Sequence, residues 1–319
     1  MMPGADEARR FAAGLDALIE HDVPIGVAVS GGPDSLALLL LTVQARPGMV
    51  QAATVDHGLR PDSAAEATMV ADLCARLAVP HAILAAAWEK PPISAIQAQA
   101  REARYELLGR WARDRGLVAV LTAHHADDQA ETLLMRLDRG AGIGGLAGAR
   151  ASRLLGPDST VSLVRPLLSW RRDELARIVE HAGLEPVDDP SNRDPRHERT
   201  RARDLLRSQG WPDALAVAAS ASHLADAEDA LEFGASTLFA ERVRIDGGSA
   251  TFDSSGLPRE YRRRVMLKLF AALGESPPRG PDLERAMTAL SAGKRCTLGG
   301  LMLTGGPVWR ADPVPPRRT

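Results

Sequence analysis

IGVAVSGGPDS, at residues 25–35, joins an apolar run to a glycine-rich turn. The run Ile25–Val29 is rich in β-branched residues and predicts a buried strand. Gly31 and Gly32 then let the backbone turn tightly and approach a ligand closely. Because the apolar stretch Leu36–Leu41 predicts a helix, the turn would direct free N–H groups and the positive end of that helix to one point. This arrangement is typical of a site for phosphate.

The turn is not the phosphate loop of kinases and GTPases, because no lysine follows its glycines. An ordinary strand-turn-helix connection would also explain the Gly-Gly pair. The remainder of the sequence distinguishes these two interpretations.

The first half of the chain alternates predicted strands and helices. We expect strands at Ile25–Val29, Val50–Val55, His81–Ala86, Val118–Ala123 and Ser162–Leu167. We expect the helices between them at Asp34–Ala45, Ser63–Leu77, Ser94–Arg115 and Asp127–Asp138. Such alternation predicts right-handed β-α-β units and a parallel, doubly wound α/β sheet, in which ligands bind beyond the carboxyl ends of the strands. The polar segments after Val29, Val55 and Ala123 should therefore lie at one edge of the sheet.

A second polar cluster, HHADDQAET at 124–132, ends one predicted strand and opens a helix. Acids in the first turn of a helix interact favourably with its dipole, and Asp128 with Glu131 resembles a capping box, which explains part of the cluster structurally. The adjacent histidines are left unexplained. Carboxylates beside a phosphate turn need a bridging cation, and Mg²⁺ is held by a few carboxylates plus phosphate oxygens. Asp34, Asp127 and Asp128 would make such a site, with Asp34 and Asp127 as the expected ligands.

The bulk properties restrict the class of protein. A chain of 319 residues suggests about two domains, and a boundary near residue 210 would divide it into 1–210 and 211–319. The second part is expected to be smaller and mainly helical, with a hairpin at 293–310 where Gly-Gly pairs separate apolar stretches. No apolar run reaches the ~18 residues of a membrane span, and Cys74 and Cys296 form no C-x-x-C pair. We expect a cytosolic protein without a membrane partner.

The net charge of −2 argues on average against a nucleic-acid partner, but two local runs of arginine argue for one. One run lies at 193–207 and the other at 259–268. Each could equally be the solvated face of a helix.

Together these motifs resemble bacterial tRNA(Ile)-lysidine synthetases. The resemblance rests on SGGPDS (30–35), TVDHGLR (54–60), ARYELL (103–108), TAHHADDQAET (122–132), RPLL (165–168) and DDPSNRDPR (188–196). It covers residues 20–210 well, whereas the C-terminal part resembles the family mainly through TLGG at 297–300. The SGG-x-DS turn alone indicates the N-type ATP pyrophosphatases, also called the PP-loop superfamily, and ARY with HHADDQAET is far more specific.

The resemblance implies a fold and a reaction. The fold would be a doubly wound sheet of the adenine-nucleotide α-hydrolase type, with an ATP-pyrophosphatase catalytic domain at 1–210 and a tRNA-binding or structural domain at 211–319. The family joins the ε-amino group of free L-lysine to C2 of the wobble cytidine in an isoleucine tRNA with a CAU anticodon. ATP first adenylates the cytidine, and lysine then displaces AMP.

The resemblance also implies roles for individual residues. Asp34 would serve Mg²⁺ and pyrophosphate, His124 would meet the phosphates, and Arg104 would support the reacting phosphate or base. Lysine would bind at Asp128 and Glu131, because an ammonium group needs carboxylates, and one of these could take the released proton. The implied ATP-binding residues are Ser30, Gly31, Gly32, Pro33, Asp34, Ser35 and Val55, and the implied catalytic residues are Asp34, Arg104, His124 and Asp128. Without the family, Arg104 would be interpreted as a solvent-facing helical arginine.

Two alternatives stay open. A tRNA thiolase with the same turn would use a sulfur donor in place of lysine, but such enzymes rely on paired or cluster-bound cysteines. A non-catalytic ATP-binding sensor would have no need for the acids at 127, 128 and 131. The chain departs from many family members at Thr200, where a basic segment usually carries asparagine. This difference affects the expected contacts with tRNA and not the ATP chemistry. The oligomeric state is left open, with a homodimer as one option.

Overall fold

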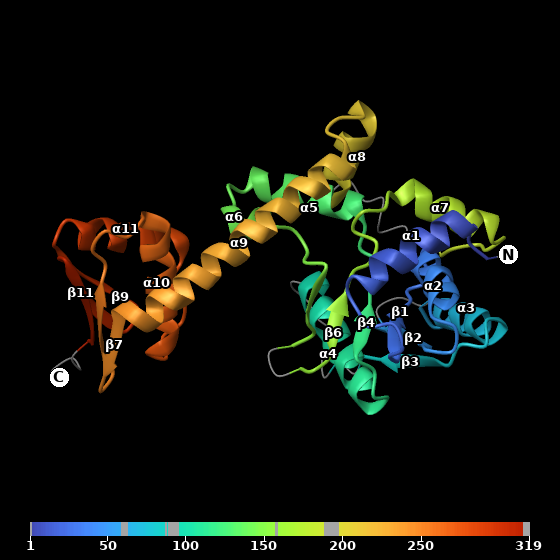
Figure 1. Ribbon diagram of the computed structural model, residues 1–319, viewed down its shortest axis with the longest axis horizontal. Helices are drawn as coiled ribbons and strands as arrows, with labels where there is room; N and C mark the ends of the chain where they lie inside the picture. Colours follow the sequence, from blue (N-terminus) through green and yellow to red (C-terminus); the bar gives the residue numbers. More distant parts are fainter. Residues whose placement is uncertain are drawn as a thin grey trace. The chain divides into compact units, whose positions relative to one another are not determined.

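The computed structural model describes residues 2–58, 63–86, 88, 96–156, 159–187 and 198–314. The chain forms two compact units that divide between Ala225 and Asp226 (Figure 1). This division lies within the long helix α9 (Ala214–Arg242), whereas we expected a boundary after residue 210. The motif at 188–196 lies outside the described residues, as do Leu59 and Arg60 of the segment at 54–60.

The first unit contains the predicted parallel sheet. Its strands are β1 (Ile25–Ala28), β2 (Val50–Asp56), β3 (His81–Ala85), β4 (Ala119–Leu121), β5 (Ser152–Leu154) and β6 (Ser162–Val164). Their order is β3-β2-β1-β4-β6-β5, and every neighbouring pair is parallel except β5 with β6. The five expected strands are confirmed, and β5 is an addition that the sequence did not reveal. Since the strand order reverses between β1 and β4, the crevice at their carboxyl ends is the place where such sheets bind ligands.

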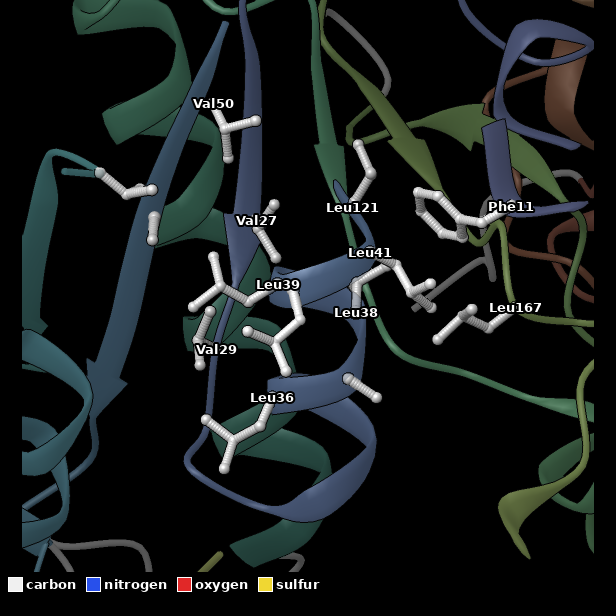
Figure 2. Packing of buried hydrophobic residues seen from close by; sticks show 14 of the residues in the cluster. Phe11, Val27, Val29, Leu36, Leu38, Leu39, Leu41, Val50, Leu121 and Leu167 are labelled. Carbon is white, nitrogen blue, oxygen red and sulfur yellow. The ribbon is translucent and has the colours of Figure 1, made fainter. Parts of the chain in front are cut away.

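Helices cover both faces of this sheet. They are α1 (Ala5–Asp16), α2 (Pro33–Ala45), α3 (Ser63–Arg76), α4 (Ile96–Asp114), α5 (Ala126–Asp138), the short α6 (Ile143–Leu146), α7 (Arg172–His181) and α8 (Glu198–Gln209). Residues Ser35–Thr42 of α2 are all buried, because α2 is enclosed by the sheet on one side and by α1 and α7 on the other. Figure 2 shows this core, with Leu39 of α2 near Val27 of β1. A helix that is surrounded by other elements is expected to be apolar on all sides.

The other face of the sheet packs against α4 through Leu108 and Trp111. Gly26 in β1 permits this approach, because a Cβ atom at that position would lie 2.6 Å from the ring of Trp111. The glycine therefore brings α4, and the arginines that it carries, close to the end of β1.

The second unit combines an antiparallel sheet with helices. Its strands are β7 (Val243–Asp246), β8 (Ser249–Asp253), β9 (Arg295–Leu298), β10 (Leu301–Thr304) and β11 (Val308–Pro313), in the order β7-β8-β11-β10-β9. The helices α10 (Arg259–Ala272) and α11 (Gly280–Ser291) supply its core with Val265 and Leu290, which pack with Phe252 and Trp309 of the strands. The expected hairpin is confirmed as part of this larger sheet.

The basic run at 259–268 presents few free cations, because most of its side chains pair within the second unit. Arg264 is 6% exposed and donates two hydrogen bonds to Glu228, at 2.6 and 2.9 Å, and one to Glu260 at 2.8 Å. The run's other ion pairs are Arg259 with Glu284, Arg263 with Glu260 and Lys268 with Glu232. A sequence count of arginines therefore overstated the positive charge that this run offers to a partner.

Candidate active site

A pocket of about 230 Å³ opens at the carboxyl ends of β1, β2 and β4, where the sheet topology predicts a ligand. It brings together residues that are far apart in the sequence. From the predicted site its lining includes Ser30, Gly32, Asp34, Ser35, Val55, Arg104, His124 and Asp128. Gly31, Pro33, Asp127 and Glu131 do not belong to this lining in the described chain.

The turn after β1 is held in shape by its own hydrogen bonds. The backbone N–H of Ser30 donates to Oγ of Ser35 at 3.1 Å, and that hydroxyl donates to the carbonyl of Gly32 at 2.9 Å. Gly31 has φ +84°, and a Cβ atom there would lie 2.9 Å from the Val187 side chain, so only glycine suits the position. The turn is therefore organised before any phosphate arrives.

The first turn of α2 completes this anion site. Pro33 occupies the first turn, where its missing N–H costs no hydrogen bond and its fixed φ suits the helix. Asp34 follows it and projects a carboxylate into the pocket. Its Oδ1 oxygen is buried without a hydrogen-bond partner, which is unfavourable unless a cation or donor meets it there.

His125 lies among three carboxylates. Its side chain is fully buried, with Nε2 3.4 Å from Asp34 and 3.6 Å from Asp128, and Nδ1 3.5 Å from Asp127. These separations are those of ion pairs, too long for hydrogen bonds of normal strength. Burial alone would lower the pKa of His125, but the three carboxylates raise it to about 10. The side chain is therefore an imidazolium at neutral pH, and nothing in the sequence distinguishes it from its neighbour His124.

His124 differs from His125 in charge. It lines the pocket, and its Nδ1 lies 3.1 Å from Oγ1 of Thr122. Burial lowers the pKa of His124 to about 3, and although Asp128 opposes the shift, the arginines Arg165 and Arg101 add to it. His124 is therefore neutral, so it can meet a phosphate by hydrogen bonding and not by charge.

Asp127 has a structural contact in addition to His125. Its Oδ2 accepts a hydrogen bond from the backbone N–H of Arg172 at 2.9 Å, which fixes the start of α7. This contact and its absence from the pocket lining do not favour the expected role of Asp127 as a metal ligand. Among the described residues no group of three His, Cys, Asp or Glu side chains has the geometry of a complete metal site. Mg²⁺ needs only one or two carboxylates when phosphate oxygens supply other ligands, and Asp34 fits that requirement.

Glu131 is not the open carboxylate that the sequence suggested. Its side chain is 1% exposed and accepts hydrogen bonds from Arg172 at 3.1 Å and from Arg199 and Arg203 at 2.8 Å each. Burial alone would raise the pKa of Glu131, but these arginines lower it. Arg199 and Arg203 are four residues apart on α8 and so share one helix face. This spacing was the available signal in the sequence.

Asp128 is the carboxylate that faces the pocket. Its Oδ2 accepts the backbone N–H of His125 at 3.2 Å, and its Oδ1 accepts a hydrogen bond from Arg199 at 3.0 Å. Burial raises its pKa, but the charges of His125 and Arg199 prevail and the pKa of Asp128 is lowered. Arg104 also lines the pocket, and it has no carboxylate partner in the described chain. The pocket thus has a phosphate turn, an acidic wall and a basic wall.

The two cysteines do not contribute to this pocket. Cys74 is buried in α3, where burial raises the pKa of its thiol to about 11, and Cys296 lies in β9 of the second unit. Neither is paired, so a cysteine-dependent sulfur transfer has no support at the site.

Comparison with known proteins agrees with this geometry. The family model for the PP-loop domain matches residues 7–209. A tRNA(Ile)-lysidine synthase from Novosphingobium aromaticivorans is 47% identical over 313 residues, which cover 98% of this chain and 95% of that protein. One from Zymomonas mobilis is 42% identical over 317 residues, with 98% and 95% covered. Among solved structures, the tRNA thiolase NcsA from Methanococcus maripaludis is similar with a TM-score of 0.56 at 16% identity, covering 69% of this chain and 79% of that one, and this shows a shared fold alone. No described helix is long and apolar enough to cross a membrane.

Proposed function

The chain belongs to the family of tRNA(Ile)-lysidine synthases, and we propose that it is an ATP-dependent ligase that joins L-lysine to C2 of the wobble cytidine in isoleucine tRNA with a CAU anticodon. AMP and pyrophosphate are the other products. The observation that carries this proposal is the single pocket that the phosphate turn, Arg104, His124 and Asp128 share. A mere ATP-binding sensor has no need for the acidic wall of such a pocket.

In the first step the cytidine O2 oxygen attacks the α-phosphorus of ATP, and the bond to pyrophosphate breaks. The N–H groups of the turn at 30–35 and the N-terminus of α2 suit the departing pyrophosphate. Arg104 also lines the pocket and can stabilise negative charge at the α-phosphate. His124, as a neutral imidazole, can orient a phosphate oxygen without adding a cation.

Asp34 would hold Mg²⁺, because its Oδ1 oxygen has no hydrogen-bond partner and carboxylate oxygens are the ligands that this ion prefers. When bound, the ion would neutralise charge that develops on the leaving pyrophosphate. The imidazolium of His125 keeps the acids in place beneath the turn.

In the second step the ε-amino group of lysine attacks C2 of the adenylated cytidine, and the bond to AMP breaks. Asp128 is the carboxylate placed to receive the ammonium form of lysine. Because the pKa of Asp128 is lowered, it is well suited to bind a cation and poorly suited to keep a proton. For lysine to approach, part of the contact between Arg199 and Asp128 must break. Glu131 would then hold Arg199 in place through its own hydrogen bond with that arginine.

The second unit would contact the body of the tRNA or support the first unit. No catalytic motif lies in residues 211–319. Since the cations of its basic run are mostly paired, contacts with tRNA would depend on other surfaces of the unit.

A labelling experiment tests the proposal. The protein is incubated with ATP, Mg²⁺, labelled lysine and an unmodified tRNA(Ile) transcript with a CAU anticodon, and each component is omitted in turn. We expect label in RNA only in the complete mixture, with release of AMP and pyrophosphate. A transcript with uridine at the wobble position is the matched control and should remain unlabelled. Release of pyrophosphate in the complete mixture without incorporation of lysine would contradict the ligase assignment. Binding of ATP without any turnover would favour a sensor.

A further inference from the structure

Four arginine side chains gather around Tyr105 on α4, beside the pocket. The guanidinium carbons of Arg101 and Arg153 each lie 5.1 Å from the centroid of the Tyr105 ring. Arg165 interacts electrostatically with the Tyr105 side chain and donates a hydrogen bond to the carbonyl of Arg150 at 2.6 Å. Arg104 is the neighbour of Tyr105 in the chain and lines the pocket with it. These residues come from α4, β5 and the end of β6, so the fold assembles the cluster.

The positive charge of this cluster is not neutralised in the described chain. None of Arg101, Arg104, Arg153 or Arg165 forms an ion pair with a described carboxylate. Arg165 is 2% exposed, and its Nε is buried without a hydrogen-bond partner. Burial and the nearby charges of Arg153 and Arg101 lower the pKa of Arg165, and burial together with Arg101 lowers that of Arg104. Among these like charges Arg165 is the buried member, and its charge is the least favourable until an anion joins it.

The nearest acids on α4 do not serve as that anion. Glu102 and Glu106 are exposed to solvent, and Glu106 lies 3.4 Å from Arg110 on the next turn of the helix. Across the pocket Asp128 is occupied by Arg199. No acid in the described part of the chain therefore neutralises the cluster, which suits an anion supplied by a ligand.

The position of the four arginines indicates the shape of this anion. Arg104 and Tyr105 line the pocket, whereas Arg101 and Arg153 lie outside its lining, and all three arginines are exposed. The ATP phosphates already have the turn at 30–35. A ligand that reaches from the pocket to the exposed arginines must carry several phosphates along an extended chain, as an RNA strand does when one base is turned out of it.

We propose that Arg101 and Arg153 bind phosphodiester groups of the RNA strand on the two sides of the cytidine that enters the pocket, with Tyr105 holding their guanidinium groups apart. Arg165 is a positioning residue, because it acts on this site by fixing Tyr105. The proposal rests on the proposed function, and it names the part of the protein that would hold the anticodon strand at the pocket.

Salt-dependent RNA binding tests the proposal without requiring turnover. The variants Arg101→Ser, Arg153→Ser and their combination are compared with Arg110→Ser, an exposed arginine of the same helix that pairs with Glu106. The affinity for the tRNA(Ile) transcript is measured by filter binding over a range of salt concentrations, without ATP or lysine. Each lost phosphate contact should weaken binding about threefold to tenfold and make the slope of log K against log salt shallower by about 0.7–0.9. Arg110→Ser should leave both unchanged, and Arg153→Lys should restore part of the slope.

Three outcomes separate the possibilities. Unchanged affinity and slope in the double variant, with its thermal stability intact, would overturn the proposal. A raised KM for ATP with unchanged RNA affinity would assign the cluster to the nucleotide and would overturn it as well. The wild-type protein could show a salt dependence of RNA binding that the variants reduce, yet form no lysidine. This result would support the RNA-binding site at Arg101 and Arg153 and contradict the proposed function.

Discussion

Nε2 of His125 lies 3.4 Å from Oδ2 of Asp34, which places a buried imidazolium directly against the carboxylate of the phosphate turn. This contact places a positive charge among the acids at the site. Asp34, Asp127 and Asp128 would repel one another, but the pKa of His125, raised to about 10 by these acids, keeps a positive charge among them. One oxygen of Asp34 remains without a partner and is therefore available to a cation.

Asp34→Asn should lower turnover by roughly 10²-fold or more, because a lost electrostatic contact to a reacting phosphate costs about that much. The amide keeps the shape of the carboxylate but can no longer hold a divalent ion. Pyrophosphate release at saturating tRNA and lysine is the measurement, repeated over a range of Mg²⁺ concentrations. Asp138→Asn, at the exposed end of α5, is the matched control and should behave as the wild type. Turnover near that of the wild type in a folded Asp34→Asn protein would remove Asp34 from the mechanism.

His124 should make the protein less stable in acid. Its pKa is lowered to about 3 in the folded protein, whereas an unfolded chain takes up the proton near pH 6.5. Between these values the unfolded state binds the extra proton, so the free energy of unfolding falls as the pH falls below about 6.5. At pH 5 this difference amounts to up to about 2 kcal/mol. Urea unfolding of wild type and His124→Gln at about pH 7.5 and pH 5 should show a smaller loss for the variant, and equal losses would contradict a neutral, buried His124.

The order of elements in the first unit followed from the sequence because alternating apolar strands and helices leave few topologies. The turn at 30–35 was equally clear, since the positive φ of Gly31 requires a glycine there. β5 escaped prediction because a three-residue, exposed edge strand has no apolar pattern. In the second unit the short strands β7 and β8 carry charged residues and gave an equally weak signal.

The sequence predicted most of the residues that form the candidate site, but it did not predict which of them are charged. The sequence placed His124 and His125 together, but only their surroundings make one neutral and the other an imidazolium. It assigned Glu131 to lysine because the resemblance implied it, whereas three arginines from α7 and α8 occupy that carboxylate. Long-range pairs of this kind depend on how helices meet, and spacing along the chain does not reveal them.

Arg264→Met should destabilise the second unit without affecting the pocket. Arg264 is buried, and it donates hydrogen bonds to both Glu228 and Glu260. Removing one partner of a buried ion pair costs roughly 3–5 kcal/mol, and the partial exposure of Glu228 favours the lower end. Thermal unfolding should show an earlier transition for the second unit. Arg285→Met removes an exposed arginine that pairs with Asp282 on α11 and should cost less than about 1 kcal/mol. Equal losses for the two variants would mean that the buried network contributes nothing specific.

The last prediction separates Asp128 from Glu131, which are three residues apart on α5 and differ in what their carboxylates face. Asp128 lines the pocket, whereas Glu131 is enclosed by Arg172, Arg199 and Arg203. Asp128→Asn keeps the shape but removes the charge that an ammonium group would meet, so the KM for lysine should rise about tenfold to a hundredfold, equivalent to about 1–3 kcal/mol. The adenylation step on tRNA should change much less.

Glu131→Gln removes one charge from the same helix and serves as the matched comparison. It leaves three arginines around a neutral, buried amide, so the main effect should be a lower thermal stability from weakened contact between α5 and α8. Its effect on lysine should be the smaller one, because Glu131 acts on that site only through Arg199. Lysine titrations at saturating ATP and tRNA are made on both variants, alongside thermal melts. A larger KM increase in Glu131→Gln than in Asp128→Asn would show that the arginines leave Glu131 when lysine binds, and lysine would then bind directly to Glu131.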